Sequence, residues 1–520
     1  MRRTYIFQIA HHILTRITER RARVPLLISI LLGAMFTVFI SCQPFKSRTI
    51  ENLKVNNAGS LRKGLQYLLF QTGGGSFPTD VAGGTARVST RAQAEKEIDD
   101  LIAALGGNRG NHVNTQLGFT TGPYSFDMTD DQVRTLIKDS FDLAETKNIA
   151  VAFHIDDSMF WNRREDLWSK KENIEWTDWE GTTKPRRVIG WAKNAEGESF
   201  LAPQMCYNST EIVNEAKRVA KDVIGAEIKK GMDRLRAIGK PHLFAGVMAG
   251  WETRLQDDSQ NPHNEYGYCA LTNLGFTRDN PPADKNKEFE GVVLTWVTLW
   301  TKSLYDAGIP RDKIFTHIAY DSNADAQEVN AVNAPVSVAF TPYSNPGYSM
   351  YGNSYPDTVA KALAENGNPP WGISEGTALS LTDAFNGGTS DKTVMEGYLA
   401  GAFNHGAAYV NVFGVNFANP ELDEFAKSST GVEAIAAYKK FLNQEPLKEV
   451  PYVSENVDIG KQLQDVLKQM QDAIKAAQAE GKNLSFLDDA SKELTELLEG
   501  GKAKEAIDKA KEIIAQIEAA

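Results

Sequence analysis

HLFAGVMAGWE, at residues 242–252, is a continuous apolar run that ends on a tryptophan and a glutamate. Strands of a parallel sheet that is covered on both faces have such runs, because neither face meets water. Similar runs occur at intervals on both sides of this one. The expected strands are 65–73, 113–119, 149–156, 242–252, 314–321, 336–344, 370–376 and 407–414.

Amphipathic segments separate these runs and predict helices. They cover residues 93–105, 210–238, 288–307, 391–404 and 430–443. Eight strand–helix units predict an α/β fold, a (β/α)8 TIM barrel over residues 61–450. An open doubly wound sheet of six or seven units is the alternative. A phosphate site in it is not expected, because no G-x-G-x-x-G follows the first strand.

The 520 residues are 42% hydrophobic and 24% charged, which is an ordinary globular composition. The formal net charge is −11, and removal of residues 1–41, whose net charge is +5, leaves −16. So acidic a chain is not expected to bind nucleic acid or to lie on an anionic membrane.

Cys206 and Cys269 could form a disulfide or remain buried thiols.

The first 41 residues have the character of a leader. An Arg-rich segment precedes PLLISILLGAMFTVFI at 25–40, which is shorter than the roughly 20 residues of a membrane-spanning helix. Ser41-Cys42 resembles the end of a bacterial lipobox. The resemblance implies a lipoprotein signal peptide over 1–41, lipidation of Cys42, a tether over 42–60 and a lipid-anchored place in the bacterial cell envelope. An uncleaved anchor with an incidental cysteine is the alternative.

Residues 455–520 are dense in Lys, Glu, Ala, Gln and Leu, with helical periodicity. Breaks near 481–483 and at Gly500-Gly501 divide them into three amphipathic helices, which predict a small C-terminal α-helical bundle. A spacer or packing role is the simplest interpretation, and binding of a partner or a sugar is the alternative.

Two glutamates lie where a barrel places its catalytic groups, at the carboxyl ends of strands. Glu252 ends the fourth expected strand and Glu375 ends the seventh, in WGISEGT. A carboxylate after an apolar run needs a partner or a function. Each glutamate alone could form an ion pair, but two across one barrel mouth match the acid and base of glycoside hydrolysis. Such carboxyls lie about 5–5.5 Å apart in retaining enzymes and about 6.5–9.5 Å apart in inverting ones.

This arrangement resembles the clan A retaining glycoside hydrolases, which carry one glutamate on strand 4 and one on strand 7. The resemblance implies that Glu252 is the acid/base and Glu375 the nucleophile, and that Tyr343, ending the sixth expected strand, bonds the nucleophile. An ionised Glu375 would raise the pKa of Glu252. The chain departs from the clan at Trp251, where an asparagine that binds the sugar 2-hydroxyl is usual.

Further polar and aromatic residues at the expected strand ends are candidates for substrate binding. Long loops at 157–208 and 253–287 could build a cleft for a polar substrate with apolar faces, such as a sugar. Each aromatic residue could instead serve packing, and His154 could be a barrel histidine with satisfied hydrogen bonds. The candidates are Gln71, His154, Asp156, Asp157, Trp161, Trp251, His317, Asp321, Trp371 and Asn416.

Three competing chemistries have weaker support. Glu265, in HNEYGY, resembles the acid/base motif of one β-galactosidase family, but it lies in an expected loop. Gly372 to Gly376 read G-x-S-x-G, which would make Ser374 a nucleophile, although Glu375 offers a simpler role. A metal on Asp156, Asp157, His317 and Asp321 is not expected, because the first strand lacks the H-x-H of amidohydrolases.

The sequence therefore predicts a lipid-anchored retaining glycosidase that acts on β-linked oligo- or polysaccharides without a cofactor or metal. A non-catalytic glycan-binding lipoprotein on the same barrel is one alternative. An inverting glycosidase that uses Glu252 and Glu375 is the other. The sugar, the choice of exo or endo action and the oligomeric state do not follow from the sequence.

Overall fold

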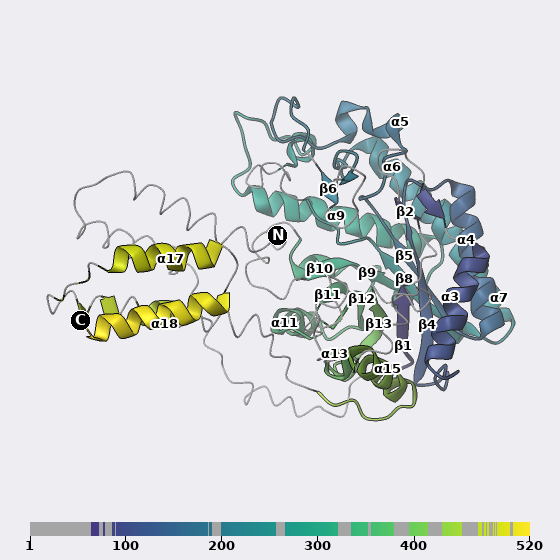
Figure 1. Cartoon of the computed structure of the whole chain (residues 1–520). Coiled ribbons are helices and arrows are strands. Elements are labelled where there is room, and N and C mark those ends of the chain that lie inside the picture. Colours follow the sequence, from purple (N-terminus) through teal and green to yellow (C-terminus); the bar gives the residue numbers. More distant parts are fainter. Residues whose placement is uncertain are drawn as a thin grey trace. The chain divides into compact units, whose positions relative to one another are not determined.

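The computed structural model of the protein describes much of the chain between residues 64 and 519 (Figure 1). The leader and tether expected over 1–41 and 42–60 lie outside the described residues. The chain divides into two compact units, one of which spans Ser60–Tyr452. Besides 1–63, the undescribed residues are 72–75, 79–85, 89, 186, 190–198, 256–265, 321–333, 352–354, 379–394, 414–428, 450–465, 471–472, 475, 478–481, 483, 485, 500–502 and 520.

One sheet of parallel strands forms the centre of the larger unit, in the order β10-β11-β12-β13-β1-β4-β5-β8-β9. A single residue, His317, separates β9 from β10, so the two ends of this order are continuous in the chain and the sheet closes into a barrel of eight strand positions. The (β/α)8 barrel is thereby confirmed, and the open sheet is excluded. The strands are β1 Gln66–Gln71, β4 Thr115–Tyr124, β5 Ala150–Ile155, β8 Phe244–Ala249, β9 Ile314–Thr316, β10 Ile318–Tyr320, β11 Gly347–Tyr351, β12 Trp371–Thr377 and β13 Ala407–Val412.

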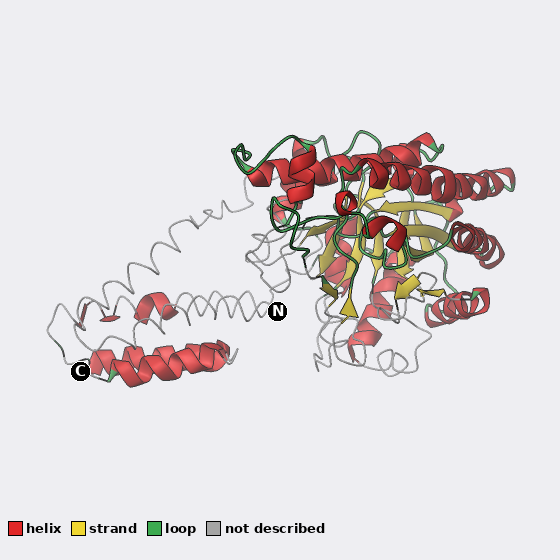
Figure 2. Cartoon of the chain, turned by 90° about the horizontal axis from the view of Figure 1, so that it is seen from above, coloured by secondary structure: helices red, strands yellow, loops and turns green. Residues whose placement is uncertain are grey.

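Helices surround the strands, as the view from above shows (Figure 2). Helices α6 and α7 are joined by a π-helical turn, η3 (Val219–Gly225), and together fill the helix expected over 210–238. Helices α4 and α11 were not among the expected ones. The main helices are α3 Arg91–Ala104, α4 Asp130–Lys147, α6 Thr210–Arg218, α7 Ala226–Ala237, α9 Lys285–Asp306, α11 Asp357–Glu365, α13 Met395–Phe403 and α15 Ser429–Leu442.

Short elements decorate the loops between these strands and helices. Two small antiparallel ribbons, β2 with β3 and β6 with β7, lie in the loops that follow β1 and β5. The short elements are β2 Ser76–Pro78, β3 Ala86–Val88, β6 Val188–Ile189, β7 Ser199–Phe200, α5 Glu165–Trp168, η2 Lys171–Asn173, η4 Pro241–Leu243, α8 Tyr268–Asn273, η5 Arg311–Lys313 and η6 Val336–Ala339.

One expected strand is wrong. Residues 336–344 contain the 3-10 helix η6, and the strand of that unit, β11, begins only at Gly347. The apolar side chains of Val338 and Ala339 are buried, but in a helical turn rather than in the sheet. A short apolar run signals burial and does not by itself distinguish a strand from a helical segment.

The barrel interior has its own small core, separate from the larger core between strands and helices. Small side chains such as Ala150, Ala152 and Ala408 fill it together with the large Phe315 and Tyr409, whose rings meet edge to face with centroids 4.7 Å apart. Burial of a large apolar side chain contributes about 1.5–3 kcal/mol. This interior packing makes the barrel a solid support for the residues at its mouth.

The C-terminal residues form a unit with a separate apolar core. Helices α17 (Leu487–Glu499) and α18 (Ala503–Ala519) bury Leu494, Ile507 and Ile513, and residues 466–470 are also helical. These elements correspond to the expected helical module. Across the residues that the structure describes, no helix combines the length and the apolar character needed to cross a bilayer.

Candidate active site

The two glutamates singled out by the sequence lie at the mouth of the barrel. Glu375 is the fifth residue of β12, and Glu252 lies three residues beyond β8. Burial, and after it the negative charge of Glu252, raises the pKa of Glu375, so the two carboxyls lie close enough to interact electrostatically. The structure therefore brings this predicted pair together.

Glu252 lies on a loop with an unusual backbone conformation. Its φ angle is 52°, in the left-handed region that few residues other than glycine adopt. Such conformations concentrate at functional sites, where surrounding contacts hold them. The carboxylate of Glu252 accepts an ion-paired hydrogen bond of 3.1 Å from Arg254.

Asp157 holds this loop in place. Its Oδ1 accepts from the Trp251 backbone amide at 3.2 Å, and its Oδ2 accepts from Thr253 Oγ1 at 2.6 Å and from Trp296 Nε1 at 2.8 Å. The Asp157 side chain is buried, so these bonds replace its lost hydration. Asp157 was expected to bind substrate, but the structure uses it to position the segment that carries Glu252.

Replacing Asp157 with asparagine should reduce turnover through this loop. The amide keeps one acceptor oxygen and adds two N–H donors, which are repelled by the four donors around it, the three named above and the Ser158 hydroxyl. A displacement of about 1 Å at a catalytic group can cost on the order of 10²-fold in rate, so we expect kcat to fall by roughly that factor while KM changes less. Steady-state kinetics with a thermal melt would measure this. Unchanged kcat in the folded variant would show that Asp157 does not position Glu252.

Glu375 is buried beside polar side chains. The Tyr351 hydroxyl donates a 2.6 Å hydrogen bond to its Oε1, and the Trp251 side chain also hydrogen-bonds the carboxyl. Burial, together with the charge of Glu252, raises the pKa of Glu375 to about 8 despite these bonds. The sequence did not indicate the raised pKa of Glu375, which follows from the deep burial of that side chain.

The backbone beside Glu375 requires glycine. A Cβ on Gly376 would lie 1.8 Å from the Met350 carbonyl oxygen and 2.5 Å from the Tyr398 hydroxyl. Strand β11 therefore approaches β12 closely at this point, which brings Tyr351 into reach of Glu375. The hydrogen bond of Tyr351 to the neighbouring carboxylate depends on this approach.

His154, His317 and Ser349 form a buried chain next to the pair. His154 Nε2 lies 2.8 Å from His317 Nδ1, and His317 Nε2 lies 2.5 Å from Ser349 Oγ. Ser349 is the register partner of Glu375 in the sheet. Burial lowers the pKa of His317 to about 3 and lowers that of His154 well below its usual value, so both rings are neutral.

Gln71 and Asn411 connect the other strands at the mouth. Gln71 Nε2 donates to the Gly122 carbonyl at 2.9 Å, and Asn411 Nδ2 donates to Gln71 Oε1 at 3.1 Å and to the Ser374 carbonyl at 2.8 Å. The sequence indicated Gln71 but missed Asn411, whose only signal is a polar residue within the buried strand β13. These bonds fix the backbone next to Glu375.

Tyr343 does not contact the nucleophile candidate. It lies in the turn before β11, and its ring packs on Tyr305 and Lys302 of α9. The displaced strand explains the error, because β11 ends at Tyr351 and not at Tyr343. Tyr351 has the interaction that the resemblance implied for Tyr343. The sequence signal for Tyr351 was its position at the end of GYSMY, a segment that contains glycine, serine and aromatic residues.

Three further predicted binding residues have structural partners instead. Asp156 accepts from the backbone amides of Ser158, Met159 and Phe160, which turn its carboxyl into its own loop. Trp161 is fully buried and donates to the Pro203 carbonyl. Trp371 begins β12, so it lies at the opposite end of the strand from Glu375, and it donates to the His405 carbonyl.

Trp251 remains at the site through its bond to Glu375 and its ring contact with His154, at a centroid distance of 5.5 Å. Asp321, Asn416, Cys42 and Glu265 lie outside the described residues.

Ser374 is buried, and its hydroxyl hydrogen-bonds the Thr316 carbonyl and the Tyr409 hydroxyl. The Ser374 side chain is therefore held in the barrel interior. Neither of these two hydrogen-bond partners is a base that could activate its hydroxyl as a nucleophile.

The side chains that could hold a metal in the structure differ from those considered from the sequence. His154, His317 and Glu375 each offer a ligand atom, and these atoms lie within 4.8 Å of one another. Asp156 and Asp157 are occupied by the bonds described above. The two histidines hydrogen-bond each other and Ser349, whereas Glu375 Oε2 has no hydrogen-bond partner among the described residues.

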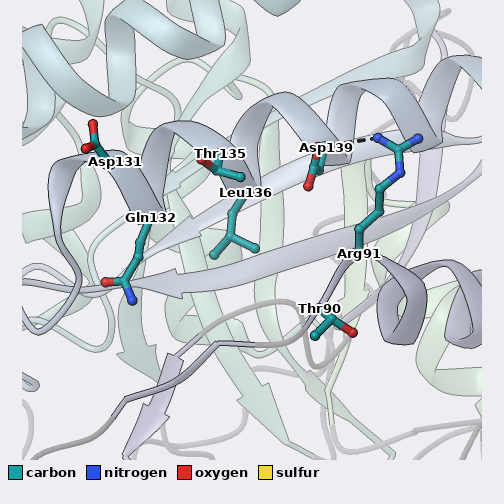
Figure 3. Close-up of a pocket in the computed structure, with 7 residues that line it drawn as sticks. All are labelled: Thr90, Arg91, Asp131, Gln132, Thr135, Leu136 and Asp139. Atoms are coloured by element: carbon teal, nitrogen blue, oxygen red, sulfur yellow. Dashed lines mark hydrogen bonds and ion pairs between the residues drawn. The ribbon is translucent and has the colours of Figure 1, made fainter.

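A separate hollow lies on the outer surface between α3 and α4 (Figure 3). Arg91 points across it to Asp139, at 3.3 Å. Its lining carries no buried carboxyl pair and no histidine, so its composition does not suit the chemistry of the barrel mouth. The lining residues are Thr90, Arg91, Asp131, Gln132, Thr135, Leu136 and Asp139.

No family model matches the sequence, and no curated protein matches it either. Among solved structures, the catalytic domain of β-amylase from Paenibacillus polymyxa is 9% identical, with 74% of this chain and 100% of that chain covered and a TM-score of 0.44. A broad-specificity GH5-4 endoglucanase from an uncultured bacterium is 9% identical, covering 73% and 94%, with a TM-score of 0.39. A β-galactosidase from the psychrophilic Marinomonas ef1 is 10% identical, covering 73% and 59%, with a TM-score of 0.40. Likenesses this distant carry no argument about activity, which is argued below from the site.

Proposed function

We propose that this chain is a glycoside hydrolase that cleaves β-glycosidic bonds of oligo- or polysaccharides with retention, anchored to the bacterial envelope through Cys42. The observation that supports it most is the pair of electrostatically interacting carboxyls, Glu252 and Glu375, at the mouth of a parallel barrel. Two opposed carboxyls of different environment supply the acid and the nucleophile that acetal cleavage needs. A glycan-binding protein has no need of such a pair.

In this mechanism Glu375 attacks the anomeric carbon while Glu252 gives its proton to the departing oxygen. A covalent glycosyl–enzyme forms, and Glu252 then takes a proton from the water that releases the sugar. Tyr351 and Trp251 stabilise the carboxylate of Glu375 before attack. Burial and the charge of Glu252 raise the pKa of Glu375 to about 8, so Glu375 holds a proton in the free enzyme at neutral pH, and the reaction requires that proton on Glu252.

The raised pKa of Glu375 favours a second candidate with exchanged roles. A buried carboxyl that keeps its proton at pH 7 suits a general acid, and Glu252, ion-paired to Arg254, then suits the base. Glu252 would activate a water molecule, and the product anomer would be inverted. The anomer released first, followed by NMR, distinguishes this inverting enzyme from the retaining one.

The proposed activity is tested by a turnover screen of the chain from residue 43 onward. Aryl glycosides and a polysaccharide panel would be offered, with Glu252→Gln and Glu375→Gln alongside and melting temperatures as the check of folding. Turnover lost in both variants supports the proposal and identifies the sugar. Turnover that persists in both variants contradicts it, and saccharide binding without turnover supports the glycan-binding alternative.

The pH dependence follows from the shared proton. Deprotonation removes the active one-proton form of the pair, so kcat/KM should fall as pH rises through about 8, the value to which burial and Glu252 raise the pKa of Glu375. A pH–rate profile measures this, and its inflection belongs to the pair rather than to one residue. A profile that is flat from pH 7 to 9 would contradict the coupling.

Replacing Tyr351 with phenylalanine should slow the reaction and shift the profile. The Tyr351 hydroxyl lowers the pKa of Glu375, so its loss should move the alkaline fall to higher pH. A hydrogen bond to a charged group contributes about 1.5–3 kcal/mol, so we expect kcat to fall on the order of 10- to 100-fold. Tyr343→Phe is the matched control and should behave like wild type. If the two variants had equal effects on kcat and on the pH profile, Tyr351 would have no specific role at Glu375.

A further inference from the structure

Two loops that rise from the barrel meet at a pair of cysteines outside the catalytic pair. Cys206 precedes α6, at the end of the segment that follows β5, and Cys269 lies in α8, within the segment that follows β8. Cys206 is buried, and Cys269 is partly exposed. Both are free thiols in this structure.

Hydrogen bonds fasten the two segments around these thiols. Asn273 Nδ2, on α8, donates to Cys206 Sγ at 3.4 Å and to Asn208 Oδ1 at 3.0 Å. Asn208 Nδ2 in turn donates to the Ala270 carbonyl, at 2.9 Å. The side chains of Cys206 and Cys269 also hydrogen-bond each other. The two sulfur atoms are therefore neighbours in a rigid setting, across two segments of chain.

A buried carboxyl accompanies the thiols. Glu175 Oε2 accepts from the backbone amides of Cys269, at 3.1 Å, and Ala270, at 3.3 Å. The Cys206 thiol donates to Asn208 Oδ1 at 3.3 Å and also interacts with the Glu175 carboxyl, which lowers the pKa of Glu175 against the larger effect of burial. Burial raises the pKa of Glu175 to about 8. Removal of a carboxylate from water is costly, so these bonds offset only part of the cost of burying Glu175. Glu175 can accept the proton of Cys206, whose own pKa burial raises well above its usual value.

We propose that Cys206 and Cys269 are a disulfide-forming pair in which Glu175 is the base. The oxidant is a small-molecule disulfide. The thiolate of the partly exposed Cys269 attacks it, releases one thiol and becomes a mixed disulfide. Cys206 gives its proton to Glu175 and attacks Cys269 Sγ, which releases the second thiol. Two protein thiols are oxidised to one disulfide, and one external disulfide is reduced to two thiols.

The bond joins the segment that carries Asp157 to the segment that carries Glu252. It closes a loop of more than 60 residues, and long loops gain the most from closure in the chain-entropy account. We expect the oxidised protein to melt roughly 5–10 °C above the reduced one. The pair then stabilises the loops around the barrel mouth in an oxidising compartment.

The test is covalent and needs no substrate, so it stands or fails separately from the proposed activity. The full chain would be reduced, exposed to oxidised glutathione at pH 8, quenched with an alkylating agent at intervals and mapped by peptide mass spectrometry. We expect a glutathione adduct on Cys269 that converts to a linked Cys206–Cys269 peptide. Cys269→Ser should give no linked peptide.

Glu175→Gln tests the base. Its amide keeps an oxygen for the Cys269 and Ala270 amides but cannot take a proton, so the Cys269 adduct should accumulate and its conversion should slow at least about tenfold. Glu172→Gln, an exposed neighbour, is the matched control and should convert like wild type. A wild-type adduct that persists, or two thiols that remain alkylatable, overturns the disulfide. Equal conversion in Glu175→Gln and wild type overturns the role of Glu175.

Discussion

Replacing Glu375 with glutamine is expected to lower kcat/KM by at least about 10⁴-fold, because the amide can neither attack the anomeric carbon nor give a proton. The fold should survive. Oε1 of the amide still accepts from Tyr351, and the variant no longer holds a titratable carboxyl in a buried site. Steady-state kinetics on an aryl glycoside, with a thermal melt, measures both expectations.

The matched control is Glu365→Gln, an exposed glutamate at the end of α11. It should leave kcat/KM unchanged. Azide adds a second readout for Glu375→Ala: the small anion should fill the vacated space and restore turnover, with a glycosyl azide of inverted configuration as the product. A folded Glu375→Gln variant with near-normal activity contradicts the assignment for either role of the residue.

Replacing Glu252 with glutamine should produce a loss that depends on the leaving group. General acid catalysis contributes about 10²–10⁴-fold, so a glycoside with a poor leaving group should lose that much. A dinitrophenyl glycoside leaves without a proton, so its first step should be nearly unaffected and its glycosyl–enzyme should accumulate. Comparison of the two substrates measures this difference.

The same variant distinguishes the two role assignments. If Glu252 is instead the base of an inverting enzyme, both substrates lose activity equally, because water is then not activated for either. Arg254→Gln is the companion variant. It removes the cation 3.1 Å from the Glu252 carboxylate and should shift the pH profile without a dependence on the leaving group.

Much of the barrel could be predicted because its strands are buried on both faces. Runs such as 149–156 and 407–414 mark strands β5 and β13 within one or two residues. Strand β11 could not be found in this way. Its sequence, GYSMY, mixes glycine and serine with aromatic residues, and its place in the sheet depends on the close approach of glycine backbones to neighbouring strands.

The missed helix α4 had a readable signal. Thr129 and Gln132 form a capping box, with each side chain bonded to the other's backbone amide, and two acidic residues follow Thr129 in the first turn. This spacing of threonine and glutamine is a sequence-level mark of a helix start. The break of the fifth strand at His317 had no such signal, because it arises where one strand pairs with both β8 and β11 to close the barrel.

The sequence predicted the two candidate catalytic glutamates but not the residues that hold them in position. The two glutamates could be found because each follows an apolar run, and the end of such a run marks the end of a buried strand. Which strand-end residues face substrate and which hold a loop depends on side-chain direction, so Asp157 was taken for a binding residue although it accepts bonds from Thr253 and Trp296. The raised pKa of Glu375 likewise depends on the depth of its burial, which only the three-dimensional structure shows.

The most direct test of the account is to trap the covalent intermediate. The chain would be incubated with a dinitrophenyl 2-deoxy-2-fluoroglycoside of the sugar that is turned over fastest, and the protein and its peptides would be weighed by mass spectrometry. If Glu375 is the nucleophile, activity is lost stoichiometrically and one fluoroglycosyl group is found on Glu375, in the peptide that contains residues 371–377. A label on Glu252, or no label while the unmodified substrate is hydrolysed with inversion, would contradict it.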